Sequence, residues 1–214
     1  DTIRAGGRVL CKAKALVLVH KSLKGLEIPS TMTDTKSTFS FPKFYDFPPF
    51  FTIQPVQKTR HKQLSIWVEF LRNYQKHTRS TSVEIVKAAA DGGAPFGNPK
   101  IKRKLTADGI KTVLNEFCHQ GYGVWADESH SICRTSWKKF EEWGTILYNW
   151  AKDNGQLGRI CTLNEIRTEN SSEEFHMMEP ELLHAALKRM EKGGLAELYP
   201  GDTLDELGIK IVER

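Results

Sequence analysis

An internal duplication constrains the fold of this sequence more than any single motif. Apolar side chains at helical spacing run through residues 60–77 and predict an amphipathic helix. The members of this stripe are Leu64, Trp67, Phe70, Leu71 and Tyr74. A second stripe occupies residues 140–154, and each of its members follows its counterpart by 76 residues. They are Phe140, Trp143, Ile146, Leu147 and Trp150. The chain therefore carries one helical unit twice.

A further helix follows in each copy, and this pair repeats with an offset of 73 residues. The first begins after Thr106, a good N-cap, and ends at Gly121. The second begins at Glu179, with Pro180 in its first turn, and ends at Gly194. The apolar positions are Ile110, Val113, Leu114 and Phe117 in the first and Leu183, Ala186, Leu187 and Met190 in the second.

Hairpin signals close each copy, at residues 123–134 and 195–212. A short apolar stretch and a loop separate the two helices of each copy, so the order is helix, short strand, short helix, helix, hairpin. This is the order of a winged helix. We therefore predict an α+β protein with two tandem winged-helix domains, each of three helices plus a small antiparallel sheet. The expected domains are residues 58–136 and 137–214.

The N-terminal residues 1–38 show no sustained period and are basic and rich in Ser and Thr, so we expect a disordered extension. All segments that resemble a domain lie after Met32, so Met32 would fit as the natural start of the protein. A mitochondrial presequence over residues 1–25 is the alternative, although its Ser content and amphipathic stripe are weak. No apolar run approaches the length of a membrane span, so a soluble intracellular protein is expected.

Residues 39–57 form an aromatic and proline-rich segment of different character. Proline fixes φ and pushes the preceding residue toward extended geometry, so this segment is expected to be stiff and extended. Its centre is Phe47, Pro48, Pro49, Phe50 and Phe51. Composition leaves two alternatives open: these aromatic residues either fold back onto the first domain or insert into grooves of another protein.

The net charge of +5 suggests nucleic acid, but its distribution weakens that interpretation. Residues 46–136 carry thirteen basic and eight acidic side chains, whereas residues 137–214 carry ten and fifteen. The helices that begin after Thr106 and at Glu179 also start with carboxylates, which would repel the phosphates of DNA if these helices entered its major groove. The basic run of Lys100, Lys102, Arg103 and Lys104 is expected to be a solvated loop, with an acidic partner, anionic lipid or RNA as alternatives.

Motifs of catalysis are missing from the sequence: there is no nucleophile elbow, P-loop or HExxH, so no enzyme and no cofactor are expected. Cys118, His119, His130 and Cys133 could be drawn as a zinc set, but adjacent residues of a helix face different directions, so no metal is expected. The four cysteines form no CxxC pair and fit free thiols.

The residues from the Phe-Pro-Pro-Phe-Phe segment onward resemble a known family. The run from Phe47 to Pro55, then Thr59-Arg-His-Lys-Gln-Leu64 and Trp67, is similar to the ESCRT-II small subunits, the vacuolar protein sorting-associated protein 25 family of the endosomal sorting machinery. Further matching positions are Lys102-Arg-Lys-Leu105, Trp137, Glu141-Glu-Trp-Gly144, Leu147-Tyr148, Trp150 and Glu174-Phe-His176. The resemblance covers about residues 44–214.

This resemblance implies a non-catalytic scaffold with tandem winged helices. Two copies would join vacuolar protein sorting-associated proteins 22 and 36, with Phe47, Pro48, Pro49, Phe50 and Phe51 docking into their apolar grooves. The second winged helix, residues 138–214, would recruit vacuolar protein sorting-associated protein 20 of ESCRT-III. The implied role is multivesicular body sorting of ubiquitinated membrane proteins by a cytoplasmic protein recruited to endosomes. It would touch the membrane only indirectly and bind no nucleic acid. The alternative is a nucleic-acid-binding winged-helix regulator.

Overall fold

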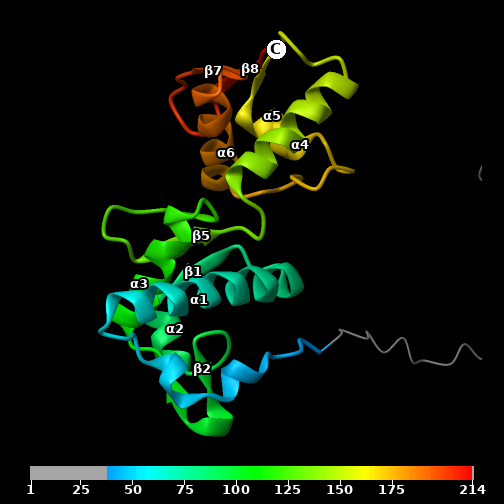
Figure 1. The fold of residues 1–214 in the computed structure, drawn as a ribbon. Helices are drawn as coiled ribbons and strands as arrows, with labels where there is room; N and C mark the ends of the chain where they lie inside the picture. Colours follow the sequence, from blue (N-terminus) through cyan, green and yellow to red (C-terminus); the bar gives the residue numbers. More distant parts are fainter. Residues whose placement is uncertain (1–37, 214) are drawn as a thin grey trace, which may run out of the picture. The chain divides into compact units, whose positions relative to one another are not determined.

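The computed structural model describes residues 38–213 of the 214-residue chain (Figure 1). The expectations for residues 1–37, namely a disordered extension, a start at Met32 or a presequence, lie outside the described residues. No helix within residues 38–213 is long and apolar enough to cross a bilayer.

The first winged helix follows the predicted element order. Its strands form an antiparallel sheet with the order β1-β5-β4, so the hairpin strand β5 is central. The short strand expected between the two helices ends at Glu84, because the backbone turns helical at Ile85. The elements are α1 (Gln57–Thr78), β1 (Ser82–Glu84), α2 (Ile85–Asp91), α3 (Ala107–His119), β4 (Gly123–Trp125) and β5 (Ile132–Thr135).

A small additional hairpin lies between α2 and α3. It consists of β2 (Gly97–Asn98), the 3-10 turn η3 (Pro99–Ile101) and β3 (Arg103–Lys104), paired antiparallel. Asn98 caps η3 by accepting a hydrogen bond from the Lys100 amide at 3.0 Å. The prediction of a plain loop for the basic run was therefore wrong, since these residues form a hairpin, although their side chains are exposed as expected.

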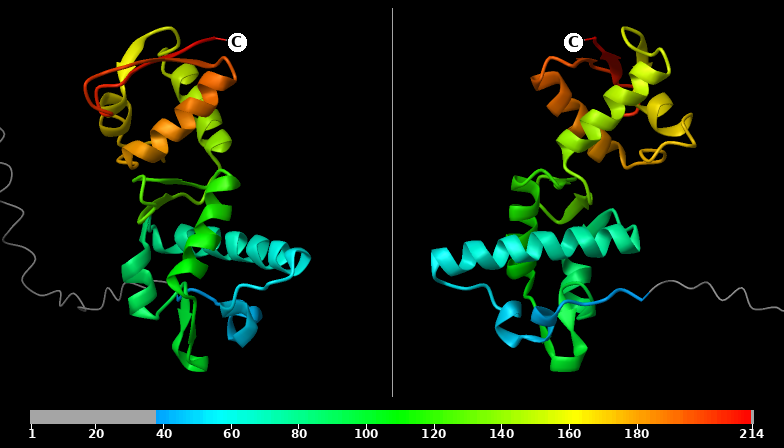
Figure 2. Two further views of the ribbon diagram at one scale, coloured as in Figure 1. Left: turned by 90° about the vertical axis from the view of Figure 1, so that its left-hand side faces the viewer. Right: turned by 45° about the vertical axis from the view of Figure 1, so that its right-hand side comes forward.

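The second winged helix repeats this order (Figure 2). Its antiparallel sheet has the order β6-β8-β7, again with the last hairpin strand pairing with the strand that follows the first helix. The elements are α4 (Phe140–Asp153), β6 (Ile160–Thr162), α5 (Leu163–Thr168), α6 (Pro180–Lys192), β7 (Ala196–Tyr199) and β8 (Gly208–Ile211). The prediction of an α+β fold with tandem winged helices is confirmed.

Local chemistry sets the ends of α3 and α6. The Thr106 hydroxyl accepts a hydrogen bond from the Gly109 amide at 3.1 Å, as an N-cap does. Glu179 is the N-cap residue of α6 and Pro180 its first residue, where a missing N–H is harmless. Gly121 and Gly194 have φ of 81° and 70°, a left-handed geometry that glycine adopts freely.

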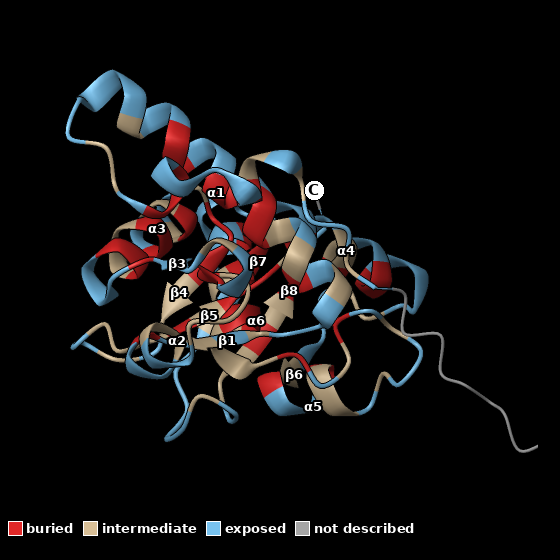
Figure 3. Ribbon diagram, turned by 90° about the horizontal axis from the view of Figure 1, so that it is seen from below, coloured by how far each residue is buried: buried red, intermediate tan, exposed pale blue. Residues whose placement is uncertain are grey.

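Each winged helix has its own apolar core, and the buried residues are coloured red in Figure 3. The first surrounds Trp67 and Phe117, and the second surrounds Trp143 and Phe175, all four essentially inaccessible to solvent. Both cores are built by the predicted helical stripes. The first core also contains Tyr45, Phe50 and Phe51 from the segment that precedes α1.

Candidate partner-binding surface

The aromatic and proline-rich segment folds into two 3-10 turns, η1 (Lys43–Asp46) and η2 (Pro48–Phe51). Phe47 between them is extended, with φ −97° and ψ 111°, as expected for a residue before proline. The expected stiff extended strip is therefore wrong for residues 48–51. Proline at the first position of η2 supplies a suitable φ and needs no N–H partner there.

Phe50 and Phe51 hold this segment on α1 through Trp67. The Phe50 ring stacks on the Trp67 indole with centroids 4.2 Å apart and planes 11° apart. The Phe51 ring meets the same indole edge-on at 5.9 Å. Only 5% of Phe50 and 4% of Phe51 is exposed, so each buries a large apolar area. These two side chains are core residues of the first winged helix.

Polar groups of α1 fasten the backbone of the same segment. The Trp67 Nε1–H donates to the Phe50 carbonyl at 3.2 Å. The buried side-chain amide of Gln63 donates to the carbonyls of Phe50 and Thr52 at 3.0 and 2.9 Å. Its oxygen accepts a hydrogen bond from the backbone N–H of Gln54 at 3.1 Å. A buried polar side chain is tolerated when it is hydrogen-bonded in this way, so Gln63 fixes the register of the segment.

The start of the segment is bound to the β2–β3 hairpin, beside which it lies in Figures 1 and 2. The Tyr45 hydroxyl donates to the Gly97 carbonyl at 2.5 Å, and the Asn98 amide donates to the Tyr45 carbonyl at 2.8 Å. Burial is the main reason that the pKa of Tyr45 is raised. Hydrogen bonds from Lys100, at 2.6 Å, and from Asn98 lower the pKa of Asp46.

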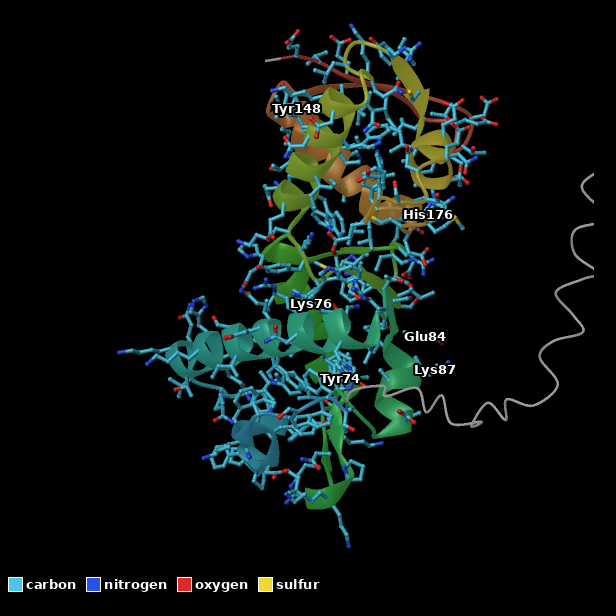
Figure 4. The ribbon with its side chains drawn as sticks, turned by 90° about the vertical axis from the view of Figure 1, so that its right-hand side faces the viewer. Tyr74, Lys76, Glu84, Lys87, Tyr148 and His176 are labelled. Carbon is cyan, nitrogen blue, oxygen red and sulfur yellow. The ribbon has the colours of Figure 1, made fainter. Side chains whose placement is uncertain are left out.

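Further upstream, Phe39 packs against Tyr74 of α1, with ring centroids 5.2 Å apart. Tyr74 is labelled in Figure 4. Contacts with both α1 and the hairpin therefore extend along the segment from Phe39 to Gln54.

The remaining residues of the predicted site face solvent. Phe47 is 58% exposed, and Pro48 and Pro49 are exposed beside it. Phe47, Pro49 and Ile66 line a mainly apolar groove of about 380 Å³, whose floor includes Phe50. The structure thus divides the five predicted residues into two buried anchors and three exposed positions.

Two exposed apolar residues were missed by the sequence analysis, and the first of them, Ile66, lines this groove. Ile66 lies on α1 outside the predicted stripe, and Val56 directly precedes the helix. An isoleucine on an otherwise polar helix face is a signal that could have identified the first of them. Val56 has no such signal, because a single apolar residue in a loop is ordinary.

The second winged helix carries a groove of its own, of about 340 Å³, between α4, β6 and α5. Ile160 at its edge is 65% exposed. The carboxylates of Glu165 and Glu169 lie in the lining, together with Arg159. The groove combines an exposed apolar residue with an excess of negative charge.

The acidic start of α6 contacts the first winged helix. Arg134 on β5 forms ion pairs with Glu179 at 3.9 Å and with Glu181 at 3.5 Å. In a winged helix that reads DNA, this end of the helix would enter the major groove. Here it faces an arginine of the same chain. The carboxylate of Glu174 pairs with Lys138.

The residues considered for zinc are only partly brought together. Cys118 and Cys133 lie with their sulfurs 3.5 Å apart. His119 is exposed, and His130 stacks on Trp125 with centroids 4.7 Å apart. Within residues 38–213, no three His, Cys, Asp or Glu side chains are grouped as metal ligands would be.

Comparison with known proteins establishes the family. The model of the family "ESCRT-II complex subunit" matches residues 44–179. The chain is 35% identical over 175 residues to vacuolar protein-sorting-associated protein 25 of Danio rerio, covering 81% of this chain and 98% of that protein. The chain belongs to the ESCRT-II complex subunit family. The human relative of the same name is 34% identical over 163 residues, which cover 75% of this chain and 92% of its own.

Solved structures of the ESCRT-II family share the fold. The crystal structure of subunit VPS25 of the endosomal trafficking complex ESCRT-II is 25% identical, covers 80% of this chain and 99% of its own, and has a TM-score of 0.64. A chain of the crystal structure of the endosomal complex ESCRT-II (VPS22/VPS25/VPS36) is 25% identical, covers 79% of this chain and 98% of its own, and has a TM-score of 0.62. The family resemblance inferred from the sequence is confirmed, and the chain is an ESCRT-II subunit.

Proposed function

We propose that this chain is a non-catalytic ESCRT-II scaffold that docks onto vacuolar protein sorting-associated proteins 22 and 36 through the exposed part of its Pro-Pro-Phe segment. Two copies would join one copy of each partner. The single observation that supports this most is the exposure of Phe47, Pro48 and Pro49 beside an apolar groove, on a backbone that Phe50 and Phe51 hold in place. An apolar patch of this kind is typical of a protein–protein contact.

The anchoring of the segment favours docking energetically. Binding costs free energy when flexible side chains and loops must be ordered, and a segment that is already ordered loses less. Phe47 is flanked on one side by Tyr45, bound to Gly97, and on the other by Phe50, bound to Trp67. Its backbone is therefore fixed before any partner arrives, and a partner groove meets a preformed aromatic projection.

Replacing Phe47 by aspartate is expected to weaken assembly with the two larger subunits by well over tenfold. Burial of one aromatic side chain contributes about 1.5–3 kcal/mol, and a buried carboxylate without a partner would be more costly still. Co-purification followed by a titration, such as isothermal calorimetry, measures the effect. Val86→Asp is the matched control, because Val86 is an exposed apolar residue of α2, away from the proposed contact. Its neighbour Lys87 is labelled in Figure 4. Equal affinity of the two variants would exclude Phe47 from the contact.

The second half of the proposal concerns residues 138–214, which would recruit the ESCRT-III subunit vacuolar protein sorting-associated protein 20. This half carries the acidic excess of the chain, with fifteen acidic and ten basic residues from position 137 on. The groove places Glu165 and Glu169 beside the exposed side chain of Ile160, and an apolar residue next to carboxylates suits a basic amphipathic helix. This would place the chain in multivesicular body sorting of ubiquitinated membrane proteins, recruited from the cytoplasm to endosomes.

Replacing Ile160 by serine is expected to weaken binding of that ESCRT-III subunit about tenfold, because an apolar contact at the rim of the groove is lost. The affinity of the native chain should also fall with increasing salt, since the groove is acidic. Fluorescence anisotropy of a labelled partner measures both effects. Met177→Ser, at another exposed apolar position of the same domain, should leave the affinity unchanged. If both serine variants bind like the native chain, the groove is not the recruitment site.

A further inference from the structure

Two thiols of the first winged helix lie side by side, and the proposed docking does not use them. Cys118 is in the last turn of α3, and Cys133 is on the central strand β5. Their Sγ atoms are 3.5 Å apart. Disulfide formation would require an approach of about 1.5 Å, which is within the reach of side-chain rotation. The two elements are packed in the same core, so the pair is fixed by the fold rather than by chance encounters.

The two sulfurs differ in access to solvent. Cys118 is partly exposed, whereas Cys133 is completely buried. The hydrogen bond with Cys118, followed by burial, raises the pKa of the Cys133 thiol far above its usual range. Because the thiolate is the reactive form, an oxidant from solvent should meet Cys118 first. Cys133 would then act as the second thiol. By that stage Cys118 is already oxidised, so the thiol hydrogen bond that raises the pKa of Cys133 no longer exists in its original form.

We propose that Cys118 and Cys133 form an oxidisable dithiol, which a peroxide converts into a disulfide that ties α3 to β5. In the first step the Cys118 sulfur attacks one oxygen of hydrogen peroxide, the O–O bond breaks, and a sulfenic acid and one water result. In the second step the Cys133 sulfur attacks the Cys118 sulfur and displaces the hydroxyl group as a second water. Two thiols lose two electrons and two protons, and one peroxide is reduced to two waters. A dithiol reductant reverses the change.

The site gives this disulfide a structural consequence. β5 pairs with β1 on one side and with β4 on the other, and its residue Arg134 carries the ion pairs to Glu179 and Glu181. A covalent link from α3 to Cys133 would hold the strand next to that contact. Oxidation should therefore stabilise the first winged helix and slow amide hydrogen exchange in β5.

Tryptic mapping of the full chain tests the proposal directly. No Lys or Arg lies between Lys111 and Arg134, so both thiols fall in one tryptic peptide, residues 112–134. After treatment with hydrogen peroxide and blocking with iodoacetamide, this peptide should carry no alkyl group and be lighter by two hydrogen masses than the unblocked reduced peptide. After dithiothreitol it should accept two alkyl groups. The oxidised chain should melt at least about 5 °C higher than the reduced chain.

Two variants make the outcome decisive. Cys161→Ser removes a thiol of the second winged helix and should leave the mass change in peptide 112–134 intact. Cys118→Ser, at a partly exposed position, should abolish the disulfide and the gain in melting temperature while the reduced variant stays folded. The proposal is overturned if both thiols remain alkylatable after peroxide. It is also overturned if oxidation stops at a sulfinic acid on Cys118, or if Cys118 pairs with Cys11 or Cys161 of another chain. This inference is independent of the proposed docking function.

Discussion

Replacing Phe50 by alanine is expected to lower the free energy of unfolding of the first winged helix by about 3–5 kcal/mol. The change removes a ring that is 5% exposed and stacks on Trp67 at 4.2 Å. The indole face then borders a cavity, which neighbouring atoms can only partly fill. The hydrogen bond from Trp67 to the Phe50 carbonyl would weaken as the turn loosens. Urea unfolding, followed by tryptophan fluorescence, measures the loss.

Phe47→Ala is the matched control, since it makes the same chemical change three residues away at a side chain that is 58% exposed. Its effect on the free energy of unfolding should be within about 0.5 kcal/mol, as for other surface substitutions. If the two alanine variants unfolded at the same urea concentration, the burial of Phe50 would not contribute to stability. The contrast also separates folding from docking, because Phe47→Ala should lower the affinity for the partners while leaving the free energy of unfolding nearly unchanged.

Replacing Gly97 by alanine is expected to destabilise the first winged helix by about 4 kcal/mol or more. A Cβ at this position would lie 2.1 Å from the Gly92 carbonyl oxygen, and a backbone atom cannot move aside as a flexible side chain can. The displacement would also disturb the Gly97 carbonyl that accepts the Tyr45 hydroxyl. The N-terminal segment should therefore loosen together with the hairpin, which amide hydrogen exchange of residues 45–54 would detect.

Gly93→Ala in the same loop provides the comparison for Gly97→Ala. A Cβ at Gly93 would lie 2.9 Å from the Asp91 carboxylate oxygen, which is the end of a flexible side chain. We expect a loss of about 1 kcal/mol or less, because Asp91 can rotate away. Similar unfolding free energies for the two alanine variants would show that the hairpin tolerates a Cβ at Gly97 by moving its backbone.

The regular elements of this fold were predictable because their determinants are local. The stripe from Leu64 to Tyr74 fixes the buried face of α1, and the hydroxyl of Thr106 fixes the start of α3. The β2–β3 hairpin was not predictable in the same way. It contains two short strands, and its position depends on Asn98 bonding to Tyr45, a residue 53 positions away in the sequence.

The candidate site was predictable as a segment but not residue by residue. The sequence shows five adjacent residues that are all apolar, and nothing in their spacing separates the buried residues from the exposed ones. That division comes from the 3-10 turn of η2, which directs Phe50 and Phe51 toward Trp67 and leaves Phe47 outside. Only the tertiary contact with α1 decides it. Proline chemistry alone favoured an extended strip and therefore gave the wrong local geometry.

The stacking of Phe50 on Trp67 has a parallel in the second half of the molecule. Trp143, which follows Trp67 by 76 residues, is met edge-on by Trp137 at 5.9 Å, and its indole N–H donates to the Ser136 hydroxyl at 2.7 Å. In both halves a leader segment covers the central tryptophan of the first helix. For the second half that leader is the connection between the two winged helices. A large rotation of one winged helix relative to the other would therefore expose Trp143. The connection between the two winged helices should thus behave as part of a hydrophobic core rather than as a flexible linker.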